Sequence, residues 1–313
     1  MPIETFADLL APFPAQRFLD EYRGQNWLHI EGTPEKAGAM LDWQGLNRLL
    51  NMEVWNHQNL LMVQDTQPIP AQAFCRQKVD RSGQPQLVPV PAQMEQHLAR
   101  GASLVLNEIE TLAPDVRGLV DAFAEGLGAK CSCNAYISQQ NHQAFDSHFD
   151  RTDVFAVQTL GQKRWRIYKG QIEAPVIHAR FTGMQKPEID RLKGKVEADV
   201  VMKPGDVLYL PRGRFHDALA TEGPSIHLSF AVSEPKGLDF LRIVMDEAVA
   251  DPAFRQDLPL DEGELPAHFE KLAERLRDLA RATRTKERGR ELRRNFVPPR
   301  PAFGLGGPRG SGR

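Results

Sequence analysis

Histidine and carboxylate residues stand close together near the middle of the chain, in the segment Asp146-Ser147-His148-Phe149-Asp150. On an extended strand, residues i and i+2 point to the same face, so His148 and Asp150 would present an imidazole and a carboxylate side by side. Two histidines and one carboxylate on one face of an octahedral ion are typical of non-haem iron sites, because the opposite face stays open. The pattern therefore needs a second histidine from elsewhere in the chain.

His216 is the candidate for that second histidine. A turn at Gly205-Asp206 precedes the strand-like run Val207–Leu210, and a second turn, Pro211-Arg212-Gly213, leads to the histidine. Neighbouring strands of a small barrel can bring residues this far apart in the chain to one metal. A His-x-Asp triplet alone is weak evidence, since short motifs arise often by chance.

The elements that must position these residues follow a period of two from residue 131 onward. Turn residues, rather than long helices, separate the short runs, which favours an antiparallel sandwich or barrel. The predicted strands are Val154–Leu160, Lys163–Tyr168, Val196–Met202, Val207–Leu210 and Ser225–Val232.

Helical patterns flank the strand-rich region, among them Pro114–Leu127 and two stripes after Pro235. We expect α+β elements over residues 1–100 that pack on the barrel, a β core over 101–235, and a helical segment over 236–283 that forms a dimer interface. Residues 284–313 are rich in Arg, Gly and Pro and lack periodicity, so we expect a basic, flexible tail there.

Composition excludes several classes of protein. The 313 residues are 41% apolar with a net charge of −2, so the chain can fill a core and is not disordered throughout. No apolar run is long enough to cross a membrane, and Met1–Ala11 lacks the basic region of a secretory signal. Three cysteines cannot pair evenly, which predicts a reducing, cytoplasmic location.

Charge is distributed unevenly along the chain. Residues 284–313 carry nine Lys/Arg against two Glu, a net charge of +7, so the remaining residues carry −9. This basic end is the only predicted contact for nucleic acid, and the acidic body favours a basic substrate segment through electrostatic steering.

Four motifs follow one another in an order and at separations that are together specific. They are Asn134-Ala-Tyr136, His148-Phe-Asp150-Arg-Thr-Asp-Val-Phe155, Gln158-Thr-Leu-Gly161-Gln-Lys163-Arg-Trp165-Arg-Ile-Tyr168, and Gly205–Pro211 continued to His216. Across residues 100–235 the chain resembles the JmjC family of iron(II)- and 2-oxoglutarate-dependent oxygenases. Within that family it is most similar to the bacterial cupin-like branch that includes ribosomal-protein hydroxylases.

The resemblance implies a mainly β fold with flanking helices, a double-stranded β-helix of the jelly-roll or cupin type. It implies that His148, Asp150 and His216 bind Fe(II), and that Lys163 pairs with the distal carboxylate of 2-oxoglutarate. The residues themselves agree on the lysine: on a strand, Lys163 shares one face with Trp165 and Ile167, and these apolar residues mark that face as inward. A buried lysine needs an anionic partner, because an unpaired buried charge is very costly.

Three further residues are candidates for the walls of the co-substrate pocket. Ser229 lies where the family often has a small polar residue, on a predicted strand that it shares with Ser225 and His227. The sequence leaves open whether this polar face lines the pocket or faces water. Asn134 and Tyr136 lie on the strand before the first metal ligand, and Tyr136 has a hydroxyl to offer a carboxylate.

The implied activity is hydroxylation of a C–H bond in a protein or peptide side chain, with consumption of O2 and release of succinate and CO2. The same fold also supports demethylation, so the sequence does not select the outcome. Two alternatives remain open, namely the same chemistry on a small molecule or free amino acid, and a non-catalytic cupin-like binding protein. The expected partners are a protein or peptide substrate and a second copy of the chain, with no membrane contact.

Overall fold

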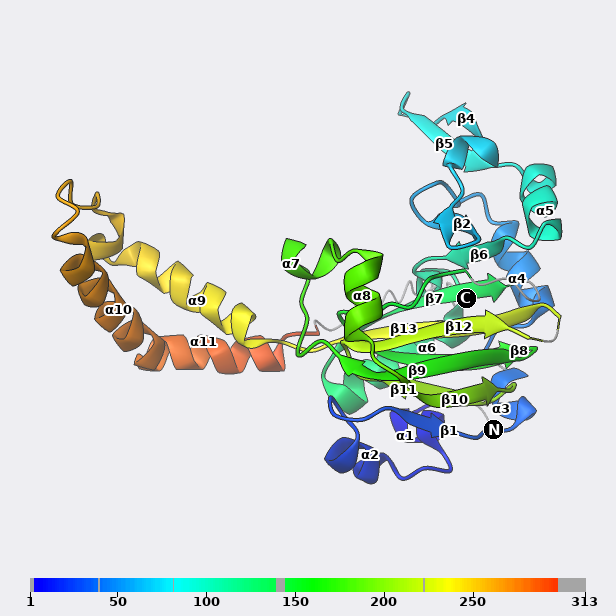
Figure 1. The fold of residues 1–313 in the computed structure, drawn as a ribbon, viewed down its shortest axis with the longest axis horizontal. Helices are drawn as coiled ribbons and strands as arrows, with labels where there is room; N and C mark the ends of the chain where they lie inside the picture. Colours follow the sequence, from blue (N-terminus) through cyan, green and yellow to red (C-terminus); the bar gives the residue numbers. More distant parts are fainter. Residues whose placement is uncertain (1–2, 39, 81, 139–143, 222, 298–313) are drawn as a thin grey trace, which may run out of the picture. The chain divides into compact units, whose positions relative to one another are not determined.

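The computed structural model describes residues 3–38, 40–80, 82–138, 144–221 and 223–297. The chain divides into two compact units, Met1–Ser233 and Glu234–Arg313 (Figure 1). Among the described residues, no helix is long and apolar enough to cross a membrane, and Cys75, Cys131 and Cys133 are free thiols.

The first unit is built around a large antiparallel sheet. Its strand order is β1-β11-β8-β13-β7-β6-β2-β3, with each neighbour antiparallel. The bounds of these strands are β1 Leu28–Ile30, β2 Leu60–Gln64, β3 Gln67–Pro68, β6 Ser103–Leu106, β7 Lys130–Ser138, β8 Asp153–Leu160, β11 Val207–Leu210 and β13 Ser225–Ser233.

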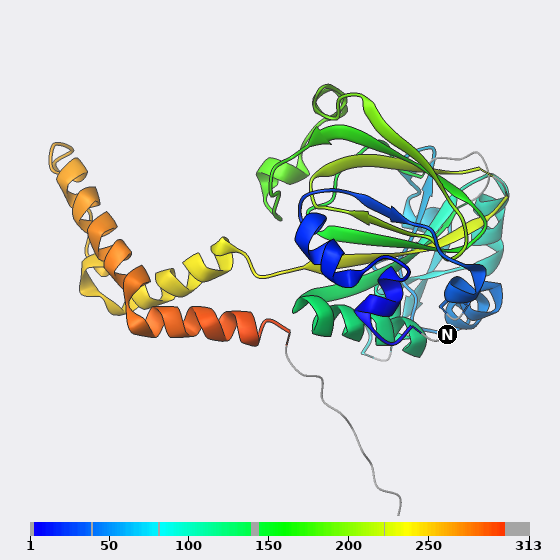
Figure 2. The same ribbon diagram turned by 90° about the horizontal axis from the view of Figure 1, so that it is seen from below.

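A second sheet faces the large one. It consists of three antiparallel strands in the order β10-β9-β12, namely β9 Lys163–Gln171, β10 Val196–Met202 and β12 Arg214–Ala220. The strands of the two sheets curve around a common interior (Figure 2). This arrangement confirms the predicted antiparallel β core. A separate hairpin pairs β4 Cys75–Val79 with β5 Pro85–Pro89.

Short helices complete the first unit. They are α1 Phe6–Leu10, α2 Ala15–Glu21, α3 Pro34–Gly38, α4 Trp43–Leu50, α5 Pro91–Ala99, α6 Pro114–Leu127, α7 Ala179–Thr182 and α8 Lys186–Leu192, with single 3-10 turns at Ala71–Ala73 and Ile109–Thr111. Helix α6 has the bounds predicted from the sequence, because Pro114 opens its first turn and Gly128 closes it at φ +58°.

The two faces of the large sheet bury different cores. One face packs against the helices through an aromatic cluster in which Phe155 contacts Phe18, Phe123 and Tyr209. The other face packs against the small sheet through Val154, Ala156, Leu208 and Leu210, which meet Trp165 and Ile167. Alternation along β8 thus directs successive side chains into the two cores.

The strand predictions hold except around the histidines. Strands β10 and β11 have the predicted bounds, and the other three differ by at most three residues at an end. Two features differ from the prediction. Strand β12, which carries His216, is not among the predicted strands, and His148–Asp150 is not a regular strand, because it makes a single bridge, His148 with His216.

The second unit contains α9 Gly237–Ala250, the 3-10 turn Pro252–Arg255, α10 Leu265–Arg281 and α11 Thr283–Arg294. The prediction of an irregular tail from residue 284 is wrong up to Arg294. Residues 284–294 belong to α11, which packs on α9: Arg284 and Arg288 both pair with Glu247, and Gly289 lies against the Phe240 ring. These tertiary contacts stabilise a helix that propensity and periodicity did not indicate. Residues 298–313 of the predicted tail lie outside the described residues.

Candidate metal centre and adjoining cavity

The three predicted metal ligands come together where the His148 segment meets β12. The backbone N–H of His148 donates to His216 O at 3.0 Å, and the N–H of His216 donates to His148 O at 2.8 Å. A third bond, from the N–H of Gly213 to Asp150 O at 2.8 Å, extends the pairing by one step. A directly opposed antiparallel pair places both imidazoles next to each other, and Asp150 follows two residues later on the same side.

The ligand atoms of His148, Asp150 and His216 all lie within 4.8 Å of one another. The imidazole centroids are 4.5 Å apart, and His216 Nε2 lies 3.5 Å from Asp150 Oδ2. His216 is buried, whereas the Asp150 side chain is 39% exposed, so the cluster is reachable from outside. Burial, followed by the neighbouring His148, lowers the pKa of His216. A neutral imidazole is the form that binds a metal.

Each histidine holds its other ring nitrogen against a backbone carbonyl. His148 Nδ1 lies 2.8 Å from Asp146 O, and His216 Nδ1 lies 3.0 Å from Arg214 O. A carbonyl oxygen only accepts, so Nδ1 carries the proton and Nε2 keeps a free lone pair in both rings. Partners of this kind orient the histidine ligands of metal sites. The donor set therefore fits a divalent transition metal such as Fe(II).

Residues next to the two histidines tie their segments together, and sequence reasoning missed them. Buried Asp217, which follows His216, accepts hydrogen bonds from Ser147 Oγ at 2.8 Å, Tyr168 Oη at 2.6 Å and Arg166 Nε at 2.8 Å. Ser147 precedes His148, so this carboxylate links both ligand segments to β9. Nothing in the sequence marks Asp217, because its partners meet only after the small sheet forms.

A cavity of about 270 Å³ continues inward from the cluster, between the two sheets. Lys163 lies in its wall, as predicted, and is 3% exposed. Its Nζ donates to Ser138 Oγ at 3.0 Å and contacts His227 Nδ1 at 3.3 Å. Burial lowers the pKa of Lys163 to about 7. The cavity therefore ends on an amine that has no carboxylate partner among the described residues.

His227 is the other buried base of this cavity. Its ring stacks on Tyr136 at 4.8 Å and meets the edge of Trp165 at 5.4 Å. Burial, and then the charge of Lys163, lower the pKa of His227 well below its usual value. A neutral His227 accepts a hydrogen bond from Lys163 when its Nδ1 carries no proton. The alternation on β13 that singled out Ser225, His227 and Ser229 was the sequence signal for this residue.

The remaining predicted pocket residues have different positions. Tyr136 and Ser229 line the cavity. Asn134 does not: its side-chain oxygen accepts from Glu108 N at 3.1 Å, and its side chain is hydrogen-bonded to Tyr136. Burial, followed by the charge of Asp150, raises the pKa of Tyr136 to about 12, so its hydroxyl stays protonated. Asn134 thus acts on the cavity through Tyr136.

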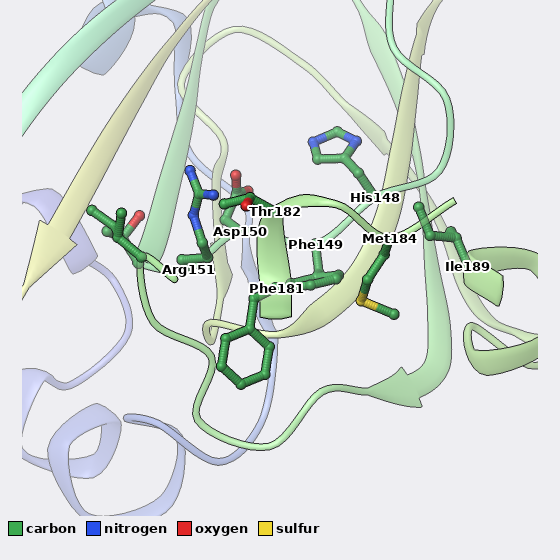
Figure 3. A pocket seen from close by; sticks show the side chains of 10 residues that line it. His148, Phe149, Asp150, Arg151, Phe181, Thr182, Met184 and Ile189 are labelled. Atoms are coloured by element: carbon green, nitrogen blue, oxygen red, sulfur yellow. The ribbon is translucent and has the colours of Figure 1, made fainter. Parts of the chain in front are cut away.

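A second hollow, about 340 Å³, opens outward from the same cluster (Figure 3). His148 and Asp150 belong to both spaces, so the candidate metal ligands stand between an inner cavity and an outer groove. The outer groove is walled by the segment between β9 and β10, including residues of α7 and α8.

Comparison with known proteins agrees with this fold. Residues 110–240 match the model of the JmjC domain. The chain is 30% identical over 170 residues, 54% of its length, to a bifunctional lysine-specific demethylase and histidyl-hydroxylase NO66 from Drosophila mojavensis, of which it covers 19%. It is 26% identical to ribosomal oxygenase 2 from Rattus norvegicus, over 97% of this chain and 66% of the relative. The chain thus spans less than two thirds of these relatives.

Solved structures show the same architecture. The X-ray structure of E. coli ycfD aligns with a TM-score of 0.57 at 18% identity, covering 87% of this chain and 69% of that chain. A structure of the same protein in complex with cobalt and 2-oxoglutarate aligns with a TM-score of 0.55 at 17% identity, covering 88% and 68%. The predicted cupin-like double-stranded β-helix is confirmed.

Residues 110–240 of the chain therefore form a JmjC domain, as the motifs predicted, and the chain is similar to ribosomal oxygenases.

Proposed function

We propose that this protein is an Fe(II)- and 2-oxoglutarate-dependent oxygenase that hydroxylates a C–H bond of a protein or peptide side chain. The observation that carries the proposal is the cluster of His148, Asp150 and His216, in which His148 and Asp150 line both the inner cavity and the outer groove. One space is suited to a co-substrate and the other to the group that is oxidised.

Each chemical requirement has residues in place. His148, Asp150 and His216 would hold Fe(II) through two neutral imidazole Nε2 atoms and a carboxylate. Lys163 would hold the distal carboxylate of 2-oxoglutarate at the end of the inner cavity, fixed there by Ser138 and His227. When bound, iron, 2-oxoglutarate and O2 supply the oxidising power, and succinate and CO2 are released. Tyr136, Trp165 and His227 wall the cavity and exclude bulk water.

A polypeptide substrate is supported by the names of two relatives and by the form of the outer groove. The relatives are described as a histidyl-hydroxylase and a ribosomal oxygenase. The groove opens to the surface beside Asp150, which gives a side chain on a longer chain access to the metal ligands.

We further propose that the protein forms a homodimer through α9 and works in the cytoplasm. The apolar residues of α9 recur with helical spacing yet remain about half exposed or more, a surface typical of an interface. They are Leu238, Leu241, Met245 and Val249. Light scattering should give the mass of a dimer for the wild type and of a monomer for Leu241→Glu.

Succinate production tests the activity. Purified protein with Fe(II), 2-oxoglutarate, ascorbate and air should form succinate, and peptides from a cell extract should increase the rate. Asp150→Asn should abolish the reaction. The matched control Asp199→Asn removes an exposed carboxylate on β10 that pairs with Arg164, and it should keep full turnover. Unchanged turnover in Asp150→Asn, or none in iron-loaded wild type, would refute the proposal.

A further inference from the structure

Arg151 directly follows the candidate ligand Asp150 and lines the outer groove (Figure 3). The residue is only partly exposed, and its guanidinium has no hydrogen-bond or ion-pair partner among the described residues. Two lysines of the β9–β10 segment do have partners: Lys186 pairs with Asp146, and Lys193 pairs with Asp190. Arg151 is thus a cation held at the groove without a counter-charge.

A guanidinium carries five donors in a planar fork that matches a carboxylate in two parallel hydrogen bonds. Reduced access to water makes such a bond stronger than on an open surface. An unpaired arginine in the wall of a groove beside a reactive centre is therefore best satisfied by an anionic group of the molecule that binds there.

The rest of the groove wall limits what that molecule is. Ile177, Phe181, Met184 and Ile189 contribute apolar side chains from the β9–β10 segment, and Ile177 is 83% exposed. Figure 3 shows Arg151 and Asp150 toward one side of the groove and His148 and Ile189 toward the other. A nucleic-acid backbone presents phosphates and sugars, with little to gain from this apolar wall. A peptide that carries an acidic residue and an apolar one satisfies both parts.

We propose that Arg151 is a specificity-determining residue that binds an acidic side chain of the polypeptide substrate, close to the residue that is oxidised. The inference rests on the proposed function. Because Arg151 and Asp150 line the same groove, the acidic residue lies near the oxidised residue in the bound substrate. The apolar wall takes a neighbouring apolar side chain. Local recognition at the groove thus selects an acidic residue despite the net negative charge of the body.

Peptide binding tests this without relying on turnover. Protein loaded with Co(II) and 2-oxoglutarate, kept free of O2, is applied to an array of peptides in matched sets that differ only by Glu, Gln or Lys at one position. Wild type should bind the Glu member of a set about tenfold more tightly than the Gln member. Arg151→Gln should remove this preference, and Arg151→Glu should reverse it toward Lys.

The matched control is Arg180→Gln, which removes an exposed arginine of α7 that does not line the groove; it should keep the wild-type preference. Equal binding of Glu and Gln peptides by wild type, or no peptide binding, would overturn the inference. Arg151-dependent binding of single-stranded RNA without a Glu preference would also overturn it. Calorimetry of 2-oxoglutarate binding on the same preparation separates the two hypotheses: lost binding refutes the proposed function, and retained binding leaves only the role of Arg151 refuted.

Discussion

Replacing Lys163 by methionine should make the protein more stable and unable to bind 2-oxoglutarate. Burial lowers the pKa of this lysine from 10.5 to about 7. The unfolded chain therefore binds more protons than the folded one between pH 7 and 10.5, so the lysine costs stability at pH 7 and less as the pH rises. A difference of about 3.5 pKa units corresponds to a cost of about 4 kcal/mol at pH 7.

Two hydrogen-bond partners offset part of this cost. The contacts of Lys163 with Ser138 and His227 contribute about 1 kcal/mol each, which leaves a net gain of about 2 kcal/mol for Lys163→Met at pH 7. For a unit of this size the gain corresponds to a rise in Tm of about 4–8 °C. At pH 9 the cost of the buried amine falls to about 2 kcal/mol, so the difference from wild type should nearly vanish.

Thermal unfolding at pH 7 and pH 9, with and without 2-oxoglutarate, measures both effects. Added 2-oxoglutarate should raise the Tm of wild type and not of Lys163→Met, since a ligand stabilises only the protein that binds it. Binding to wild type should weaken above pH 7, up to tenfold per pH unit, as the amine loses its charge. The control Lys169→Met changes an exposed lysine on the same strand and should shift stability by no more than about 0.5 kcal/mol. A less stable Lys163→Met at pH 7, or one that 2-oxoglutarate still stabilises, would refute the reasoning.

Other substitutions test the framework around the site. Asp217→Ala leaves three hydrogen-bond donors without their acceptor. Chemical denaturation should show a free energy of unfolding lower by about 3 kcal/mol, and metal titration should show roughly tenfold weaker binding. Gly213→Ala should also weaken metal binding. Gly213 has φ +85°, and an added Cβ would clash with the carbonyl oxygen of Ile172. The resulting shift of the backbone would displace the Gly213 N–H that donates to Asp150 O. Phe155→Ala opens the aromatic cluster and should lower the free energy of unfolding by about 3–5 kcal/mol, with the affinity for metal changed little. Equal stability of Phe155→Ala and wild type would contradict the packing described here.

Much of the architecture follows from local patterns in the sequence. Alternation of apolar and polar residues predicts β10, because side chains on a strand face opposite sides with period two, and a short apolar run between turn residues predicts β11. Helix α6 is predicted at both ends because Pro114 and Gly128 act through their own backbone geometry. His148, Asp150, His216 and Lys163 are identifiable from type, spacing and family resemblance, and the fold brings the first three together and places the lysine in the adjoining cavity.

Other features were decided only by tertiary structure, because they depend on contacts between residues that are distant in the chain. The His148–Asp150 segment does not form a regular strand because it pairs with β12 through one bridge only. Asn134 does not line the cavity, because its side chain makes hydrogen bonds with the Glu108 backbone and with Tyr136. Asp217 stabilises the site through an ion pair and hydrogen bonds with β9. Helix α11 is stabilised by ion pairs with α9. Local sequence sets which face a side chain prefers, whereas the partner that side chain meets depends on how the sheets and helices pack.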